Sequence, residues 1–154
     1  MNRRIGWVLA GVFVGILAVG PLQGRSEAGT GKATIRVTDR VLNVTRVDVG
    51  ARGTSPGDTE VVRSRLLERG TGVTIGRSEL VCTFVDSRRS RVCRGTYILP
   101  KGRLVVGGSI LFRQFHELAV LGGTGLFDNA RGTLTVTRTH RNPVRDLVVF
   151  RLVG

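Results

Sequence analysis

The stretch Val92–Thr137 carries the most information about architecture: VCRGTYILPKGRLVVGGSILFRQFHELAVLGGTGLFDNARGTLTVT. Runs of apolar and β-branched residues alternate in it with short segments rich in glycine and proline. Such segments are typical of tight connections between strands. This stretch, with a few residues on either side of it, therefore predicts four consecutive strands, which are Arg91–Leu99, Arg103–Phe112, His116–Leu121 and Gly132–His140.

The sequence on either side continues the same pattern. Ala33–Val49 is rich in Val, Ile and Thr, and its apolar alternation shifts at Leu42, which predicts a β-bulge or a bend. Further strands are predicted at Glu60–Glu68, at Val73–Val85 with a kink at Gly76, and at Val144–Val153 after an Asn142-Pro143 turn. About eight strands without an amphipathic helix indicate an antiparallel barrel or sandwich. A closed barrel is favoured because it leaves no exposed strand edge.

The N-terminus has the features of an export signal. Arg3 and Arg4 precede the apolar run Trp7–Gly20, which is short for a membrane span. Small residues at Ser26 and Ala28 predict cleavage before Gly29, so residues 1–28 are expected to be a signal peptide and 29–154 a single secreted or extracytoplasmic domain. An uncleaved membrane anchor is the alternative, and the arginine pair alone leaves the export route open.

The chain is strongly basic, with a formal net charge of +13 at pH 7. Lys32 and Lys101 are the only lysines, so nearly all of the positive charge is arginine. Such a surface could bind nucleic acid, anionic lipid or polysaccharide. The arginines are spread over most of the expected strands and form no basic block, so no specific nucleic-acid partner is expected.

The two cysteines are predicted to form a disulfide. Export would place them in an oxidising compartment, where pairing is the rule. If Asp86–Arg89 forms a four-residue hairpin loop, Cys82 lies opposite Cys93 at a non-hydrogen-bonded position, where cross-strand side chains are closest. A two-residue loop would instead place the two cysteines at a hydrogen-bonded position. A catalytic or zinc-binding thiol is the alternative, but two cysteines without a nearby histidine make a poor zinc site.

Several segments, in their order, resemble the allene oxide cyclase and dirigent barrels, most closely a secreted bacterial branch. They include Ser55-Pro56-Gly57-Asp58, Gly76-Arg77-Ser78, Leu99-Pro100-Lys101-Gly102 and Gly122-Gly123-Thr124-Gly125-Leu126-Phe127. The resemblance covers roughly residues 33–140. It implies an eight-stranded antiparallel, calycin-like barrel whose lumen accepts an apolar molecule. Proteins of this kind act by holding a flexible substrate in one geometry, which needs few catalytic groups.

The sequence departs from the plant cyclases at two positions. Their first-strand acid aligns with Arg36, and the nearest carboxylate, Asp39, lies three residues away. Cys82 matches a cysteine of the plant cavity, but a disulfide to Cys93 would remove its thiol. Both departures favour binding over cyclisation.

Candidate ligand-binding residues follow from strand alternation and from the first loop. If Cys82 and Cys93 face the lumen, alternation places Phe84, Tyr97 and Leu99 on the same face. Tyr97 could orient a ligand through its hydroxyl or simply cap the core. Asp48 and Asp58 could be acids or bases at the barrel mouth, but an Asp after Pro-Gly more often closes a turn.

The remaining polar motifs have simpler explanations. Gly122, Gly123 and Gly125 lack the helix and the Lys-Ser/Thr ending of a phosphate loop, so they are expected to supply positive φ at a tight strand connection. His116 and His140 have no second ligand at metal-binding spacing. No metal and no cofactor are expected, and a homo-oligomer is left open.

Three functions remain. The first is an exported barrel that binds a small apolar or amphipathic molecule without turnover. The second is an allene oxide cyclase-like or dirigent-like isomerase that acts by confinement. The third is a cationic module for envelope polyanions. Neither the sequence pattern nor the resemblance identifies the ligand.

Overall fold

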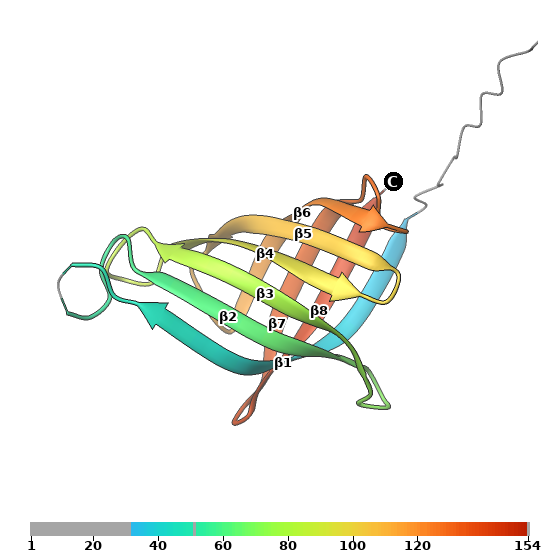
Figure 1. Ribbon diagram of the computed structural model, residues 1–154, viewed down its shortest axis with the longest axis horizontal. Coiled ribbons are helices and arrows are strands. Elements are labelled where there is room, and N and C mark those ends of the chain that lie inside the picture. The colour runs from blue at the N-terminus through green and yellow to red at the C-terminus, as the bar shows by residue number, and fades with distance from the viewer. Residues whose placement is uncertain (1–31, 51, 154) are drawn as a thin grey trace, which may run out of the picture.

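The protein folds as a closed antiparallel β-barrel in which every strand pairs with the next one in sequence (Figure 1). The structure, a computed structural model, describes residues 32–50 and 52–153. The eight strands are β1 (Ala33–Val47), β2 (Thr59–Glu68), β3 (Thr74–Phe84), β4 (Arg91–Leu99), β5 (Gly102–Ile110), β6 (Phe115–Gly125), β7 (Arg131–Arg141) and β8 (Val144–Val153). β1 pairs with β8 and closes the barrel. The predicted eight-stranded all-β barrel is therefore confirmed.

Alternation along each strand separates the lumen from the outer surface, as β8 illustrates. Asp146, Val148, Phe150 and Leu152 are buried, whereas Arg151 is exposed. Successive side chains of a strand point to opposite faces, so the even-numbered residues of β8 point inward. The inward residues of all eight strands build one hydrophobic core.

Two irregularities were predicted and both occur. The pairing of β1 with β2 shifts between Val41 and Asn43, so Leu42 is the extra residue of a bulge. The pairing of β2 with β3 shifts where Leu66 faces Gly76 and Leu67 faces Thr74. Each shift changes which residues face the lumen, as a one-residue bulge does.

The role predicted for the glycines of β6 was partly wrong. Gly122 and Gly123 lie inside β6, where they pair with Val105 and Leu104, so that β6 continues beyond Leu121. Only Gly125 has a positive φ, of 67°. A Cβ at Gly123 would collide with the carbonyl oxygen of Phe127, because the following turn folds back over the strand. Close backbone packing, and not a turn conformation, is the reason for glycine here.

The hairpin that carries the cysteines has the predicted form. Cys82 and Cys93 are cross-strand partners and form a disulfide, with their Cα atoms 4.0 Å apart. This short separation is typical of a non-hydrogen-bonded pair. The amide of Val85 donates to the carbonyl of Ser90 at 2.9 Å, which leaves Asp86–Arg89 as the loop.

The two ends of the barrel differ. At one end, to the left in Figure 1, lie the β1–β2 loop and the β3–β4 loop, together with the loop at residues 111–114. At the other end Phe127 packs against the core, and Ala130 of the same turn is buried.

The predicted signal peptide, its cleavage site and the alternative anchor fall on residues 1–29, which lie outside the described residues. Over residues 32–50 and 52–153, no helix is long and apolar enough to cross a membrane.

Candidate functional site

The lumen contains a cavity of about 160 Å³ near the end where the β1–β2 loop lies. Its apolar wall includes Val62, Leu80, Ile110 and Val136. An engineered cavity of about 150 Å³ can hold benzene, so the space accommodates one ring or a short branched chain. Ionisable and hydroxyl groups interrupt the apolar wall, namely Asp39, Ser64, Tyr97, His116, Arg138 and Asp146.

Asp39 of β1 is one of three carboxylates that border the cavity, and its side chain is buried. The Ser78 hydroxyl donates to its Oδ2 at 2.8 Å, and its Oδ1 has no partner among the described residues. Burial raises the pKa of Asp39 from 3.8 to about 6, against the opposing effect of the nearby hydroxyl groups of Ser64 and Ser78. The group can therefore hold or release a proton near neutral pH.

The placement of Asp39 bears on the comparison with the plant cyclases. That alignment put the position of their first-strand acid at Arg36, three residues from Asp39. Arg36 is exposed on the outside of the barrel, whereas Val37 and Asp39 face inward. The alternation of Ile35, Val37 and Val41 could have predicted that Asp39 faces inward, because Asp39 is also an odd-numbered residue of this strand.

Asp146 lies beside Asp39 and differs from it in its partners. The two residues are register partners on β8 and β1, and both are buried. The Arg138 guanidinium donates to both oxygens of Asp146, at 2.8 and 3.1 Å. Asp146 is thus matched by a cation, and Asp39 is not.

Tyr97 and His116 contribute the other polar atoms of the cavity wall. Tyr97 is buried edge-to-face against Phe150, with the ring centroids 5.1 Å apart. Its burial, followed by the charges of Asp39 and Asp146, raises the pKa of its hydroxyl well above the usual value. Burial lowers the pKa of His116, and its Nδ1 has no partner within the described residues. Both side chains are therefore neutral at physiological pH.

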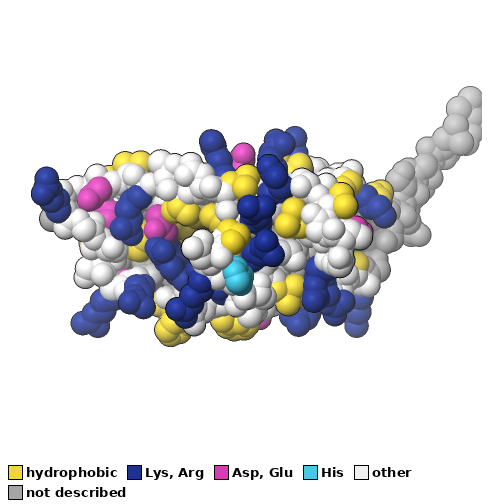
Figure 2. All heavy atoms as spheres, turned by 90° about the horizontal axis from the view of Figure 1, so that it is seen from below, with side chains coloured by type: hydrophobic (Ala, Val, Ile, Leu, Met, Phe, Trp, Pro, Cys, Tyr) yellow, Lys and Arg dark blue, Asp and Glu magenta, His cyan; other side chains and the backbone are white. Residues whose placement is uncertain are grey.

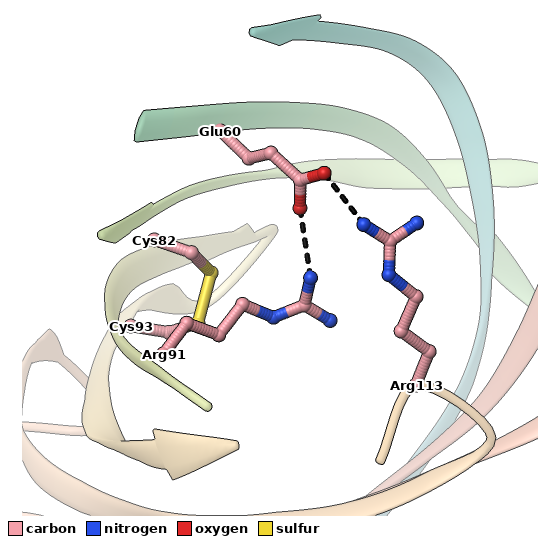
Figure 3. Close-up of a disulfide and its surroundings, with 5 residues drawn as sticks. All are labelled: Glu60, Cys82, Arg91, Cys93 and Arg113. Atoms are coloured by element: carbon pink, nitrogen blue, oxygen red, sulfur yellow. Dashed lines mark hydrogen bonds and ion pairs between the residues drawn. A yellow bond between two sulfur atoms is a disulfide. The ribbon is translucent and has the colours of Figure 1, made fainter. Parts of the chain in front are cut away.

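A cluster of charged side chains borders the inner cavity, and Figure 3 shows three of them, Glu60, Arg91 and Arg113. Glu60 accepts from Arg91 Nη1 at 2.8 Å and from Arg113 Nη2 at 2.6 Å. Arg46 lies 3.6 Å from the same carboxylate. The disulfide lies beside this cluster, since Cys93 is two residues from Arg91. The sequence suggested none of these contacts, because the partners are far apart along the chain.

Outside the cluster the barrel mouth widens into a groove of about 1020 Å³, here called the vestibule. Arg91, Arg113 and Arg138 border both the vestibule and the inner cavity. The cavity and the vestibule are therefore two parts of one path from solvent into the lumen. The outer wall of the vestibule consists mainly of arginines and aromatic side chains, including Arg46, Arg88, Arg141, Phe112 and Phe115.

The predicted ligand-binding residues are distributed over this path and beyond it. Phe84, Tyr97 and Leu99 are all buried on the inner face. Tyr97 borders the inner cavity, whereas Phe84 borders the vestibule with Arg46 stacked 4.8 Å from its ring centroid. Leu99 belongs to the packed core.

The two loop carboxylates, Asp58 and Asp48, bind backbone. Asp58 accepts from the amides of Val49 and Ser55 at 2.9 and 3.0 Å, and these bonds lower its pKa. Asp48 is exposed and accepts from the amide of Gly53 at 3.3 Å. Neither carboxylate borders the cavity, and both accept hydrogen bonds from the backbone of the β1–β2 loop.

The arginines on the outside of the barrel form no single patch on the face seen in Figure 2, where basic side chains are distributed along its length with hydrophobic ones between them. Over the described ranges, no three His, Cys, Asp or Glu side chains lie close enough together to hold a metal ion.

The sequence matches no protein-family model and no curated protein. Among solved structures, the chain is similar to a pyocyanin demethylase, with a TM-score of 0.69 and 22% identity over 79% of this chain and 100% of that one. It is also similar to the Diels–Alderase AbmU from Streptomyces koyangensis, with a TM-score of 0.63 and 19% identity over 78% of this chain and 64% of that one.

The pterocarpan synthase dirigent protein PsPTS1 has the same fold, with a TM-score of 0.59 and 14% identity over 80% of this chain and 94% of that one. These similarities confirm the resemblance to the allene oxide cyclase and dirigent barrels at the level of fold. At such identities they define the barrel alone, and function has to be argued from the site.

Proposed function

We propose that the protein binds a small, mainly apolar molecule in the barrel lumen, with a polar group of that molecule against Asp39. The observation that carries this proposal is the inner cavity itself, which has an apolar wall and a buried carboxyl group with one oxygen that no described residue contacts by a hydrogen bond. A buried polar atom without a partner is rare in folded proteins. A ligand that supplied the partner would remove that penalty.

The cavity sets limits on the ligand. Its 160 Å³ accepts one ring, so a larger ligand has to extend past Arg91 and Arg113 into the vestibule. The protonated form of Asp39 donates to a carbonyl or ether oxygen, and the ionised form accepts from a hydroxyl or an amine. Affinity for a carbonyl ligand should therefore fall as the pH rises above about 6.

The solved barrels of this fold support the proposal. Their names denote a demethylase of pyocyanin, a Diels–Alderase and a pterocarpan synthase, all of which act on small organic molecules. A further structure with this fold is described as a nonspecific heme-binding cyclase. None of these activities is carried over to this chain, but a lumen that receives a small molecule is common to the proposal and to these names.

A second candidate function is an isomerase or cyclase that works by confinement, and Asp39 is the observation that favours it. A carboxylic acid with a pKa of about 6 can protonate an oxygen as charge develops on it. Apolar walls around it would hold a flexible substrate in one reactive geometry. A missing first-strand carboxylate and the disulfide were the two sequence arguments against this function, and Asp39 supplies a carboxyl group on the first strand beside the cavity.

We also infer export. The disulfide is consistent with an oxidising, extracytoplasmic compartment. Cleavage of residues 1–28 would leave a chain that begins at Gly29, just before β1. Intact mass spectrometry of the protein recovered from the producing cells tests this: a chain that starts at Met1 would contradict cleavage.

Titration with N-phenyl-1-naphthylamine, a neutral aromatic probe whose fluorescence rises in apolar surroundings, tests lumen binding. We expect saturable binding of one probe per protein. Val136→Phe, which fills the cavity, should weaken binding about tenfold or more. Val81→Phe is the matched control, because Val81 is exposed on the outer face of β3. Far-UV circular dichroism verifies that both variants fold.

The lumen proposal fails if the probe does not bind, or if the two variants lose the same affinity. To separate the two candidate functions, any co-purified ligand identified by native mass spectrometry would be incubated with wild-type protein and with Asp39→Asn. Conversion by the wild type alone favours the isomerase, and equal recovery of unchanged ligand favours the binder.

A further inference from the structure

The charge cluster between cavity and vestibule has more cationic groups than its carboxylate can satisfy. Glu60 is the acid at the centre, and three guanidinium groups lie within 4 Å of it, from Arg46, Arg91 and Arg113. Each guanidinium has five N–H donors in a planar fork, whereas a carboxylate offers about four acceptor positions. Most of the donors are therefore not used by Glu60.

Arg91 shows this surplus most directly. Its guanidinium is buried, and its Nε has no hydrogen-bond partner among the described residues. Burial is also the first cause that lowers the pKa of Arg91, and the neighbouring Arg113 is the second. A buried donor without an acceptor is unfavourable, and so is a crowd of like charges. An additional anion would relieve both.

The wider vestibule has the same sign of charge. Arg88, Arg89, Arg138 and Arg141 also line it, and Arg138 is engaged by Asp146. The carboxylates Asp39, Glu60 and Asp146 border the inner cavity, and Asp86 is bound to the backbone of its own loop. A concave surface with one sign of charge raises the local concentration of the opposite ion.

Apolar groups stand between these cations. Phe84 lies under Arg46 and Arg91, at 4.8 and 5.6 Å from the ring centroid. Leu111, Phe112 and Phe115 are more than half exposed at the edge of the vestibule. Arginine and aromatic side chains together recognise molecules that are both anionic and aromatic.

From these contacts we propose that the ligand of the lumen is an anionic amphipathic molecule, such as an aromatic or short-chain carboxylate or sulfonate. Its acid group binds Arg91 and Arg113 beside Glu60, and its apolar body enters the inner cavity. This inference rests on the proposed lumen binding and adds the chemical class of the ligand. Arg113 is half exposed, so its guanidinium can turn from Glu60 to the ligand without unfolding the barrel.

A matched pair of fluorescent probes tests the inference. 8-Anilinonaphthalene-1-sulfonate and N-phenyl-1-naphthylamine share one aromatic skeleton, and only the first carries an anionic group. We expect the sulfonate to bind at least tenfold more tightly to the wild type. Arg113→Gln should weaken the sulfonate about tenfold, as the loss of one charge-assisted contact does, and change the neutral probe less than twofold.

Arg94→Gln is the control, because Arg94 lies exposed on β4, the strand that also carries Arg91. Arg94→Gln removes one positive charge from the outer surface of the barrel and should not change the affinity for either probe. Equal losses in Arg113→Gln and Arg94→Gln would show that only the overall charge matters and would overturn the inference. Equal affinity of the wild type for both probes would also overturn the inference that the ligand is anionic. It would leave the proposal of lumen binding intact. If neither probe binds, lumen binding fails as well.

Discussion

Asp39 and Asp146 face each other across the β1–β8 pairing, and among the described residues only Asp146 has an arginine partner. The Arg138 guanidinium pairs with Asp146, whereas the described partner of the buried Asp39 is the hydroxyl of Ser78. Burial of a carboxyl group without a cation against it raises its pKa. The lumen therefore contains one group that can exchange a proton near pH 6 beside one that is held by a salt bridge.

The raised pKa of Asp39 predicts how stability depends on pH. A carboxyl whose folded-state pKa lies above its unfolded value stabilises the fold at low pH, and this contribution is lost as the pH rises through about 6. Asp39→Asn, which cannot ionise, should be more stable than the wild type by up to about 3 kcal/mol at about pH 7.5, with a smaller gap at about pH 4.5. Urea unfolding at both pH values measures it.

Asp146→Asn is the contrasting variant for that experiment. It leaves Arg138 without its counter-charge and should lower stability at both pH values. If the advantage of Asp39→Asn is the same at both pH values, ionisation of Asp39 is not its cause.

The Glu60 cluster should contribute strongly to stability. Glu60→Gln leaves the buried Arg91 without a compensating charge, which is expected to lower the free energy of unfolding by about 3 kcal/mol. Glu79→Gln provides the comparison, since Glu79 pairs with Arg77 at 4.0 Å on the surface and its loss should change stability by less than about 1 kcal/mol. Equal effects in denaturant titrations would mean that Arg91 is solvated without Glu60.

The disulfide predicts sensitivity to reduction. It joins residues separated by 11 positions, and a loop of this length constrains the unfolded chain by about 3 kcal/mol. Dithiothreitol should lower the urea midpoint of the wild type to near that of Cys82→Ala/Cys93→Ala. The double variant serves as its own control, because the reductant should leave its midpoint unchanged. A wild-type midpoint that does not move under full reduction would contradict the expectation.

The adjacent glycines Gly122 and Gly123 should differ in how much stability they lose when a methyl group is added. A Cβ at Gly123 would lie 2.7 Å from the Arg103 carbonyl oxygen and would also meet Phe127, so Gly123→Ala should lower stability by several kcal/mol. At Gly122 the nearest atom is the end of the Arg131 side chain at 3.5 Å, so Gly122→Ala should change stability by less than about 1 kcal/mol. Thermal denaturation of the two variants compares them, and similar melting temperatures would refute the packing argument.

Local pattern was sufficient to predict the strands, the bulge at Leu42 and the Cys82–Cys93 pair. Each depends on alternation or on hairpin symmetry over a few residues, where chain geometry leaves little freedom. The same reasoning failed at Gly122 and Gly123, because composition alone does not distinguish a turn from a strand that needs close backbone packing. The position of Asp39 was missed because the family alignment pointed to Arg36, whereas the alternation of the strand indicated that Asp39 faces the lumen.

The charge cluster could not be found in this way. Glu60 meets Arg91 and Arg113 across 31 and 53 residues of sequence, and Asp39 meets Asp146 only where the first strand pairs with the last. Alternation along a strand tells which face a side chain takes, and it follows from the chain alone. The strand register, the bulges and the closure of the barrel decide which side chains meet in the lumen. They do so because they place residues from distant strands at the same level along the barrel axis.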